Sequence, residues 1–125
     1  MLLNPSDFNK VSEYALDEYS KEYIASDDFG AFPPLGILYV MAYLEKNASH
    51  YKLYFKDCVA ERYGHHKLVD YVTGIKPDFV AMTSFTISMI DVVLAAQNIR
   101  KIVPEAHLCL GGHHPIAFPF EAASL

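Results

Sequence analysis

The 125-residue chain contains only two cysteines, no tryptophan and no long apolar run. Cys58 and Cys109 are too few for a disulfide framework or a four-thiolate metal site, so both are expected to be buried free thiols in a reducing, cytoplasmic compartment. A helix that crosses a bilayer needs about 20 consecutive apolar residues, and no basic, apolar leader opens the chain. Neither secretion nor a membrane partner is therefore expected.

Clusters of basic residues are also missing. Ten Lys and Arg face fifteen Asp and Glu, the net charge is −5, and the acidic residues concentrate between Asp7 and Asp28. Binding to a phosphate backbone depends on clustered Lys and Arg, so no nucleic-acid partner is expected. With 52% apolar and 20% charged residues, the composition is typical of a single soluble domain with its own core.

Several nucleotide-binding and catalytic motifs are absent too. The segment after the first apolar run, Asn4-Pro5-Ser6-Asp7, has no glycine, which excludes a dinucleotide-binding loop, and there is no P-loop. The third apolar run ends at Thr83-Ser84 without the aspartate of a phospho-receiver domain. Thr83-Ser84-Phe85 is not the Gly-x-Ser-x-Gly elbow of a hydrolase either.

Apolar runs of strand length alternate with amphipathic helical patterns along the chain. The predicted strands cover residues 1–4, 51–57, 79–82 and 106–110, and the predicted helices begin at Pro34 and cover 65–75 and 88–103. This alternation predicts a doubly wound α/β domain with a parallel sheet of strand order 2-1-3-4. Lys52 and Lys56 place the second strand at an edge.

The helix that begins at Pro34 shows an apolar face at helical spacing. Its residues are Leu35, Leu38, Tyr39, Ala42 and Lys46, widened by Met41 and Leu44. Two further helices are expected, one within residues 12–25 of a long tyrosine-rich loop and one that starts near Phe118.

A flavodoxin-like sheet would have a fifth strand beyond the fourth, and the chain does not supply one. Leu108, Leu110 or their neighbours would then lie on an open apolar edge. We therefore expect residues 1–125 to be a fragment of a longer protein. The alternative is a four-stranded domain whose open edge is covered by a partner.

Ligands of such sheets bind outside the carboxyl ends of the strands. Here those ends carry Thr83-Ser84-Phe85-Thr86 and Gly111-Gly112. The hydroxyls of Ser84 and Thr86 could contact amide, ribose or phosphate groups, and the glycine pair would let backbone approach a ligand closely. Two plainer interpretations stay open: Ser84 or Thr86 caps the following helix, and the glycines form an ordinary turn.

Two histidine pairs, His65-His66 and His113-His114, raise the question of a metal site. Neighbours on a strand point to opposite faces, and neither pair has the i, i+4 spacing of a helical zinc site. No protein-ligated metal is predicted, and His113 or His114 is expected to lie near a bound ligand or at an exposed turn.

Five segments in order resemble the cobalamin-binding domain that precedes the catalytic barrel of many radical SAM enzymes. They begin with Leu2-Leu3-Asn4-Pro5 and the first-helix signature Phe32–Glu45, followed by Asp57 after the second strand. Residues 76–86 and 104–115 resemble that family's third and fourth strands. The resemblance implies a corrinoid ligand. The residues that it assigns to the cofactor are Pro34, Leu35, Gly36, Asp57, Thr83, Ser84, Thr86, Gly111, Gly112 and His113.

The resemblance also implies how the cofactor would be held. Some cobalamin domains ligate cobalt through the histidine of an Asp-x-His-x-x-Gly loop after the second strand. In this chain, Val59 occupies the position of that histidine, and Arg62 occupies the position of the glycine. Base-off cobalamin without a histidine from this loop is expected. Asp57 is either a cofactor contact or a polar strand end.

The cysteine triplet that holds the iron–sulfur cluster of a radical SAM barrel is absent. The chain alone is therefore not expected to be catalytic; S-adenosylmethionine and the [4Fe-4S] cluster would belong to a C-terminal barrel of the parent enzyme, a methyltransferase or similar. Two functions remain: a module that presents corrinoid to that barrel, or a domain that kept the fold, lost the cofactor and serves as a scaffold or docking surface.

Overall fold

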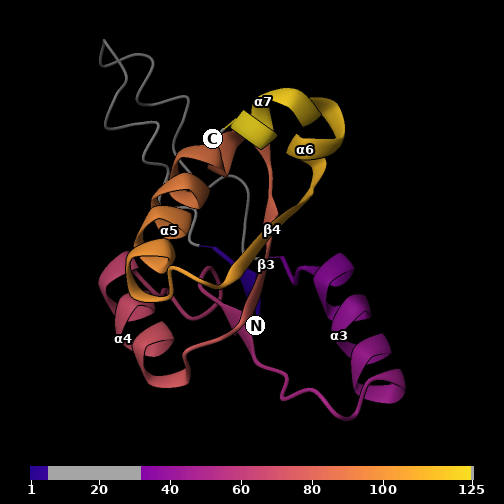
Figure 1. Ribbon diagram of the computed structural model, residues 1–125. Helices are drawn as coiled ribbons and strands as arrows, with labels where there is room; N and C mark the ends of the chain where they lie inside the picture. The colour runs from indigo at the N-terminus through magenta and orange to yellow at the C-terminus, as the bar shows by residue number, and fades with distance from the viewer. Residues whose placement is uncertain (6–31, 125) are drawn as a thin grey trace, which may run out of the picture.

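The computed structural model describes residues 1–5 and 32–124, which form a four-stranded, all-parallel sheet of order β2-β1-β3-β4 (Figure 1). The strands are β1 (Leu2–Asn4), β2 (Phe55–Asp57), β3 (Phe79–Ser84) and β4 (His107–Gly112). The predicted doubly wound, flavodoxin-like topology is confirmed. β2 and β4 are the two edges, as Lys52 and Lys56 predicted for the second strand.

Helices lie on both faces of this sheet. Figure 1 shows α4 (His65–Ile75) and α5 (Met89–Ile102) on one face and α3 (Leu35–Asn47) on the other. A short 3₁₀ turn, η2 (Thr86–Ser88), leads into α5, and α6 (His113–Ala117) and α7 (Pro119–Ser124) follow the carboxyl end of β4. The helix expected within residues 12–25 lies outside the described residues.

The main core fills the space between the sheet and the α4–α5 layer. Leu3, Val80 and Met82 point from the strands into this layer, because residues two apart on a strand share a face. They pack with four helical side chains that are likewise buried, Leu68, Val72, Ala95 and Ile99. The buried residues of the helices thus follow the 3.6-residue helical period, and those of the strands follow the 2-residue period.

The strand register fixes what lies on the opposite face. Leu2 pairs with Ala81, and Thr83 pairs with Gly111. Paired residues of a parallel sheet share a face, so these residues lie on the α3 side. α3 contacts β1 but covers little of β3 and β4.

Three strand predictions need correction. The second strand was expected over residues 51–57, but only the last three residues pair, because β1 offers just Leu2–Asn4 as a partner. Before that pairing begins, the amide of Leu2 donates to the carbonyl of Tyr54 at 2.8 Å. The third and fourth strands, in contrast, each run two residues further than predicted, to Ser84 and Gly112. The glycine pair is therefore a strand end, and not a turn.

The inner face of α3 also differs from the prediction. Leu35 and Tyr39 are 63% and 76% exposed, whereas Ile37 is buried and Met41 and Leu44 are half-buried. Apolar residues surround most of this helix, so periodicity alone did not show which side meets the sheet.

Candidate functional site

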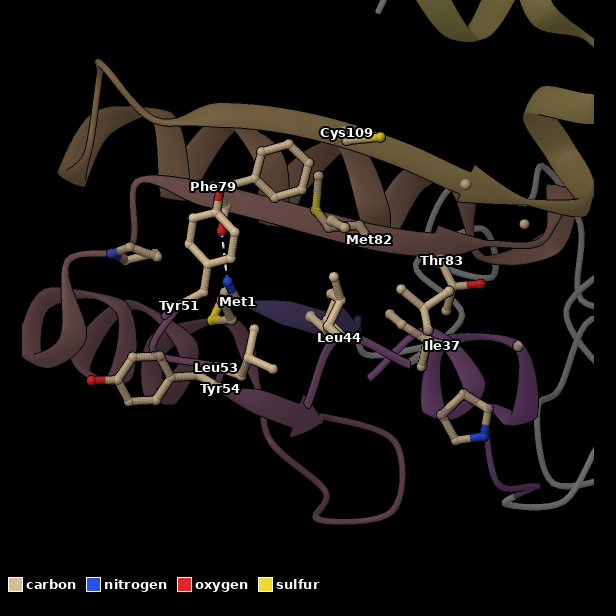
Figure 2. Close-up of a pocket in the computed structure, with 18 of the residues that line it drawn as sticks. Met1, Ile37, Leu44, Tyr51, Leu53, Tyr54, Phe79, Met82, Thr83 and Cys109 are labelled. Carbon is tan, nitrogen blue, oxygen red and sulfur yellow. Dashed lines mark hydrogen bonds between the residues drawn. The ribbon is translucent and has the colours of Figure 1, made fainter. Parts of the chain in front are cut away.

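A cavity of about 1140 Å³ lies between α3 and the uncovered face of the sheet (Figure 2). Its walls are the N-terminal part of α3, the α3-facing side of β1, β3 and β4, and residues 51–54 before β2. We call it the sheet cavity. Its lining is mainly apolar with few polar groups, and its volume lies slightly above the usual range of about 300–1,000 Å³ for small-molecule sites.

The two ends of the sheet cavity have different chemistry. Figure 2 shows Thr83 and Ile37 toward the carboxyl end of the strands and Tyr51 and Phe79 toward the amino end. At the amino end, the amino group of Met1 donates to the carbonyl of Phe79 at 2.6 Å. Burial lowers the pKa of this amino group, and the nearby Asp78 carboxylate opposes that shift.

The structure brings together most of the residues predicted to hold the cofactor. Seven of the ten line the sheet cavity: Pro34, Leu35, Gly36, Thr83, Gly111, Gly112 and His113. They come from the start of α3 and from the carboxyl ends of β3 and β4, which are far apart in the sequence. Asp57, Ser84 and Thr86 do not line it, and each has a partner within the fold.

Gly112 is required by the packing of the sheet itself. Its φ is +96°, and a Cβ added here would lie 2.4 Å from the carbonyl oxygen of Ser84 and 2.9 Å from Oγ1 of Thr83. Its missing side chain thus allows β4 to approach β3. A Cβ on Gly111 would meet nothing nearer than 3.8 Å, so Gly111 is the glycine that leaves space in the sheet cavity.

Ser84 is almost fully buried, and its hydroxyl donates to the carbonyl of Gly111 at 3.0 Å. This bond ties the ends of β3 and β4 together. Neither Ser84 nor Thr86 caps the following helix; instead, the hydroxyl of Ser88 bonds the backbone of Phe85. The interpretation that Ser84 or Thr86 caps this helix is therefore wrong.

Asp57 organises the end of β2. Its Oδ1 accepts from the side-chain amide of Asn4 at 2.9 Å and from the backbone amides of Val59 and Ala60 at 3.1 Å. The carboxylate is buried. Through these hydrogen bonds Asp57 stabilises the loop that follows β2. It does not line the sheet cavity.

Thr86 pairs with the second histidine of its doublet. Oγ1 of Thr86 lies 3.2 Å from Nδ1 of His114, which is only 2% exposed. Both residues line a second space of about 400 Å³ beside α5. The adjacent histidines thus separate: His114 packs inside the fold, and His113 faces the sheet cavity.

No role was predicted for Phe85 from the sequence. Its ring is half exposed and stacks on that of His113, with 4.9 Å between the ring centroids and 15° between their planes. Both rings line the sheet cavity at the carboxyl end of the sheet. A large apolar residue directly after a strand, among small hydroxylated neighbours, was the signal that could have revealed it.

The two cysteines differ from the expectation that both are buried. Cys58 is fully buried, and burial raises the pKa of its thiol to about 12. Cys109 is exposed and lines the sheet cavity from β4 (Figure 2). Its side chain shares the face of Gly111 because the two residues are two apart on one strand.

Other polar groups lie on the far side of the sheet. Nε2 of His65 is 3.1 Å from Oδ1 of the buried Asp91, which links α4 to α5. Across residues 1–5 and 32–124, no three His, Cys, Asp or Glu side chains group as metal ligands. In the same part of the chain, no helix is both long and apolar enough to cross a membrane.

A parallel α/β sheet with an apolar cavity that reaches the carboxyl ends of its strands is the architecture of a small-molecule or cofactor-binding domain. The model of the B12 binding domain family matches residues 24–125, so the chain belongs to this family. This membership, together with the relative described below, supports the resemblance to the cobalamin-binding domain of radical SAM enzymes.

The chain is also similar to a much longer protein, the anaerobic magnesium-protoporphyrin IX monomethyl ester cyclase of Cereibacter sphaeroides. The two are 31% identical over 85 residues, which is 68% of this chain and 14% of the cyclase. No solved structure matches the chain.

Proposed function

We propose that this chain binds a corrinoid over the carboxyl ends of β1, β3 and β4 and holds the nucleotide tail in the sheet cavity. The observation that carries the proposal is the position of the cavity. It is bounded by Thr83, Gly111 and His113 at the edge where ligands of parallel sheets bind. Membership of the B12 binding domain family supports cobalamin as the ligand.

The lining of the cavity fits such a ligand. Apolar side chains of Ile37, Val40 and Leu44 face the sheet from α3 and suit the planar base of the tail. The Thr83 hydroxyl and the exposed backbone of Gly111 offer hydrogen bonds near the mouth. When bound, the corrinoid supplies the cobalt chemistry; the residues of this chain position it and exclude water from its tail.

The corrinoid would act in a larger enzyme. The chain spans 14% of the cyclase that it resembles, so the rest of such a protein has room for a catalytic domain. We propose a radical SAM barrel, with S-adenosylmethionine and a [4Fe-4S] cluster, as the neighbour that receives the corrinoid. A methyl transfer or a related radical reaction would then take place in that barrel.

Retention of hydroxocobalamin tests the binding step. The chain is mixed with an excess of hydroxocobalamin and desalted, and the corrinoid absorbance is compared with the protein concentration. We expect about one corrinoid per chain. Gly111→Leu places a bulky side chain in the cavity and should abolish retention. Gly74→Ala is the matched control, because Gly74 lies in α4 with nothing within 4 Å of an added Cβ. Loss of all corrinoid from the folded, unmodified chain would refute the proposal.

A docking surface without cofactor is the second candidate. Several large apolar side chains on α3 and on the α6–α7 segment are exposed: Leu35, Tyr39, Tyr43, Ile116 and Phe120. Such side chains favour contact with another protein surface. This function predicts that cobalamin is removed completely by desalting while the chain stays folded.

A further inference from the structure

We propose that His113 is an axial nitrogen ligand of cobalt in the corrinoid-loaded domain. This inference rests on the proposed corrinoid function and assigns a ligand outside the loop after β2, where Val59 and its neighbours supply no histidine. The geometry that points to it is the exposed, stacked imidazole at the carboxyl end of the sheet cavity.

The stack with Phe85 orients this imidazole without covering its nitrogens. The two rings are nearly parallel, at 15°, with centroids 4.9 Å apart. The lone pair of an imidazole nitrogen lies in the plane of the ring, so a stacked face leaves the ligating edge available. Within the part of the chain that the structure describes, no hydrogen bond engages either nitrogen of His113. Neutral imidazole is the commonest side-chain ligand of metals in proteins.

The other histidines have positions that exclude this role. His114 is buried with Nδ1 bonded to Thr86. His65 is bonded to Asp91 in the α4–α5 layer on the far side of the sheet, and His66 follows it on α4. His107 begins β4, at the amino end.

His50 is the remaining histidine, and it too lies far from the carboxyl edge. It precedes β2, and its ring packs at a tilted angle against Tyr51, which lines the amino end of the sheet cavity. Cys109 lines the cavity but lies within β4, four residues before His113. At the carboxyl end of the strands, His113 therefore offers an uncommitted nitrogen that no other described histidine matches.

Cobinamide is the probe that tests this assignment, because it lacks the nucleotide base and so brings no axial nitrogen of its own. The chain is loaded with cobinamide in imidazole-free buffer, retention is measured by absorbance, and the same sample is reduced to the Co(II) state for electron paramagnetic resonance. We expect each cobalt line to split into three through one ¹⁴N ligand. The split should change to two lines in chain labelled with ¹⁵N-histidine.

His113→Ala should remove this splitting and weaken cobinamide binding by about tenfold or more. His107→Ala is the matched control, because His107 is an exposed histidine at the amino end of β4, the strand that leads to His113; this variant should keep the splitting. His113→Gln, which preserves a polar side chain, checks that folding is intact and should also lack the splitting. Circular dichroism of each variant accompanies the spectra.

The outcomes separate the two proposals. Retained cobinamide without nitrogen splitting, or splitting that survives His113→Ala, refutes ligation by His113 and leaves the corrinoid function standing. A folded chain that retains neither cobinamide nor hydroxocobalamin refutes both. Splitting that depends on His113 and persists in the His107 variant establishes the ligand.

Discussion

Replacement of Gly112 by alanine tests the contact between β3 and β4 on which the carboxyl end of the sheet cavity depends. The new Cβ would lie 2.4 Å and 2.6 Å from the backbone O and N of Ser84, and the backbone φ of +96° is unfavourable for any L side chain. With ψ at −166°, this is an extended, positive-φ conformation that essentially only glycine adopts, and it costs any other residue about 1–3 kcal/mol. Forcing an extra carbon into a packed contact costs about 1–3 kcal/mol. The expected loss of unfolding free energy is therefore about 2–6 kcal/mol.

Urea denaturation followed by circular dichroism measures this loss. With a denaturant slope of about 2 kcal/mol per molar urea, the midpoint should fall by roughly 1–3 M. Gly111→Ala is the matched control, because its Cβ would be at an ordinary 3.8 Å from Met82 O; its free energy should stay within about 0.5 kcal/mol of the unmodified chain. Equal midpoints for the Gly112 and Gly111 variants would refute the close approach of β4 to β3.

Four further predictions follow from the site. Gly111→Ala should weaken the binding of hydroxocobalamin without changing the stability of the chain, since the added methyl group enters the sheet cavity. Equilibrium dialysis measures this affinity, and an unchanged affinity would contradict the proposed position of the ligand. Ser84→Ala should lower the unfolding free energy by about 1 kcal/mol, because the bond to Gly111 is lost; a neutral result in urea denaturation would count against that bond. A thiol reagent such as dithionitrobenzoate should label Cys109 rapidly and Cys58 only on unfolding, and bound hydroxocobalamin should slow the first reaction; rapid labelling of both thiols would be inconsistent with the structure. Burial raises the pKa of the Cys58 thiol from 9.0 to about 12 in the folded chain. Its contribution to the free energy of unfolding should therefore be complete below pH 9 and should decline as the pH rises above 9. Cys58→Ala should remove this part of the pH dependence when unfolding is measured as a function of pH.

The sequence was sufficient for the topology and for most of the residues that meet at the carboxyl edge of the sheet. Alternation of strand and helix patterns predicted the parallel order, and the carboxyl ends of the third and fourth strands were correctly chosen as the place where Thr83, Gly111 and His113 meet. Local pattern could not assign the individual roles. Ser84 was predicted to face a ligand, yet its hydroxyl is engaged across the β3–β4 pair, which depends on strand register. Gly112 lines the sheet cavity, but the same register also requires its missing side chain at the contact with Ser84.

Two other differences have the same origin in tertiary contacts. The second strand is short because β1 offers few residues to pair with, and this limit belongs to another segment of the chain. The inner side of α3 could not be chosen because apolar residues surround the helix. Phe85 was passed over because it stands among hydroxyl residues, and its stacking partner lies 28 positions away in the sequence.

The sheet cavity has one rigid wall and one compliant wall. Six consecutive residue pairs join β3 to β4, whereas α3 buries only Ile37 among its side chains. Displacing this helix exposes little apolar surface and costs correspondingly little free energy. For the proposed corrinoid ligand, we therefore expect the β3–β4 side to decide selectivity and α3 to shift outward when the tail is bulkier.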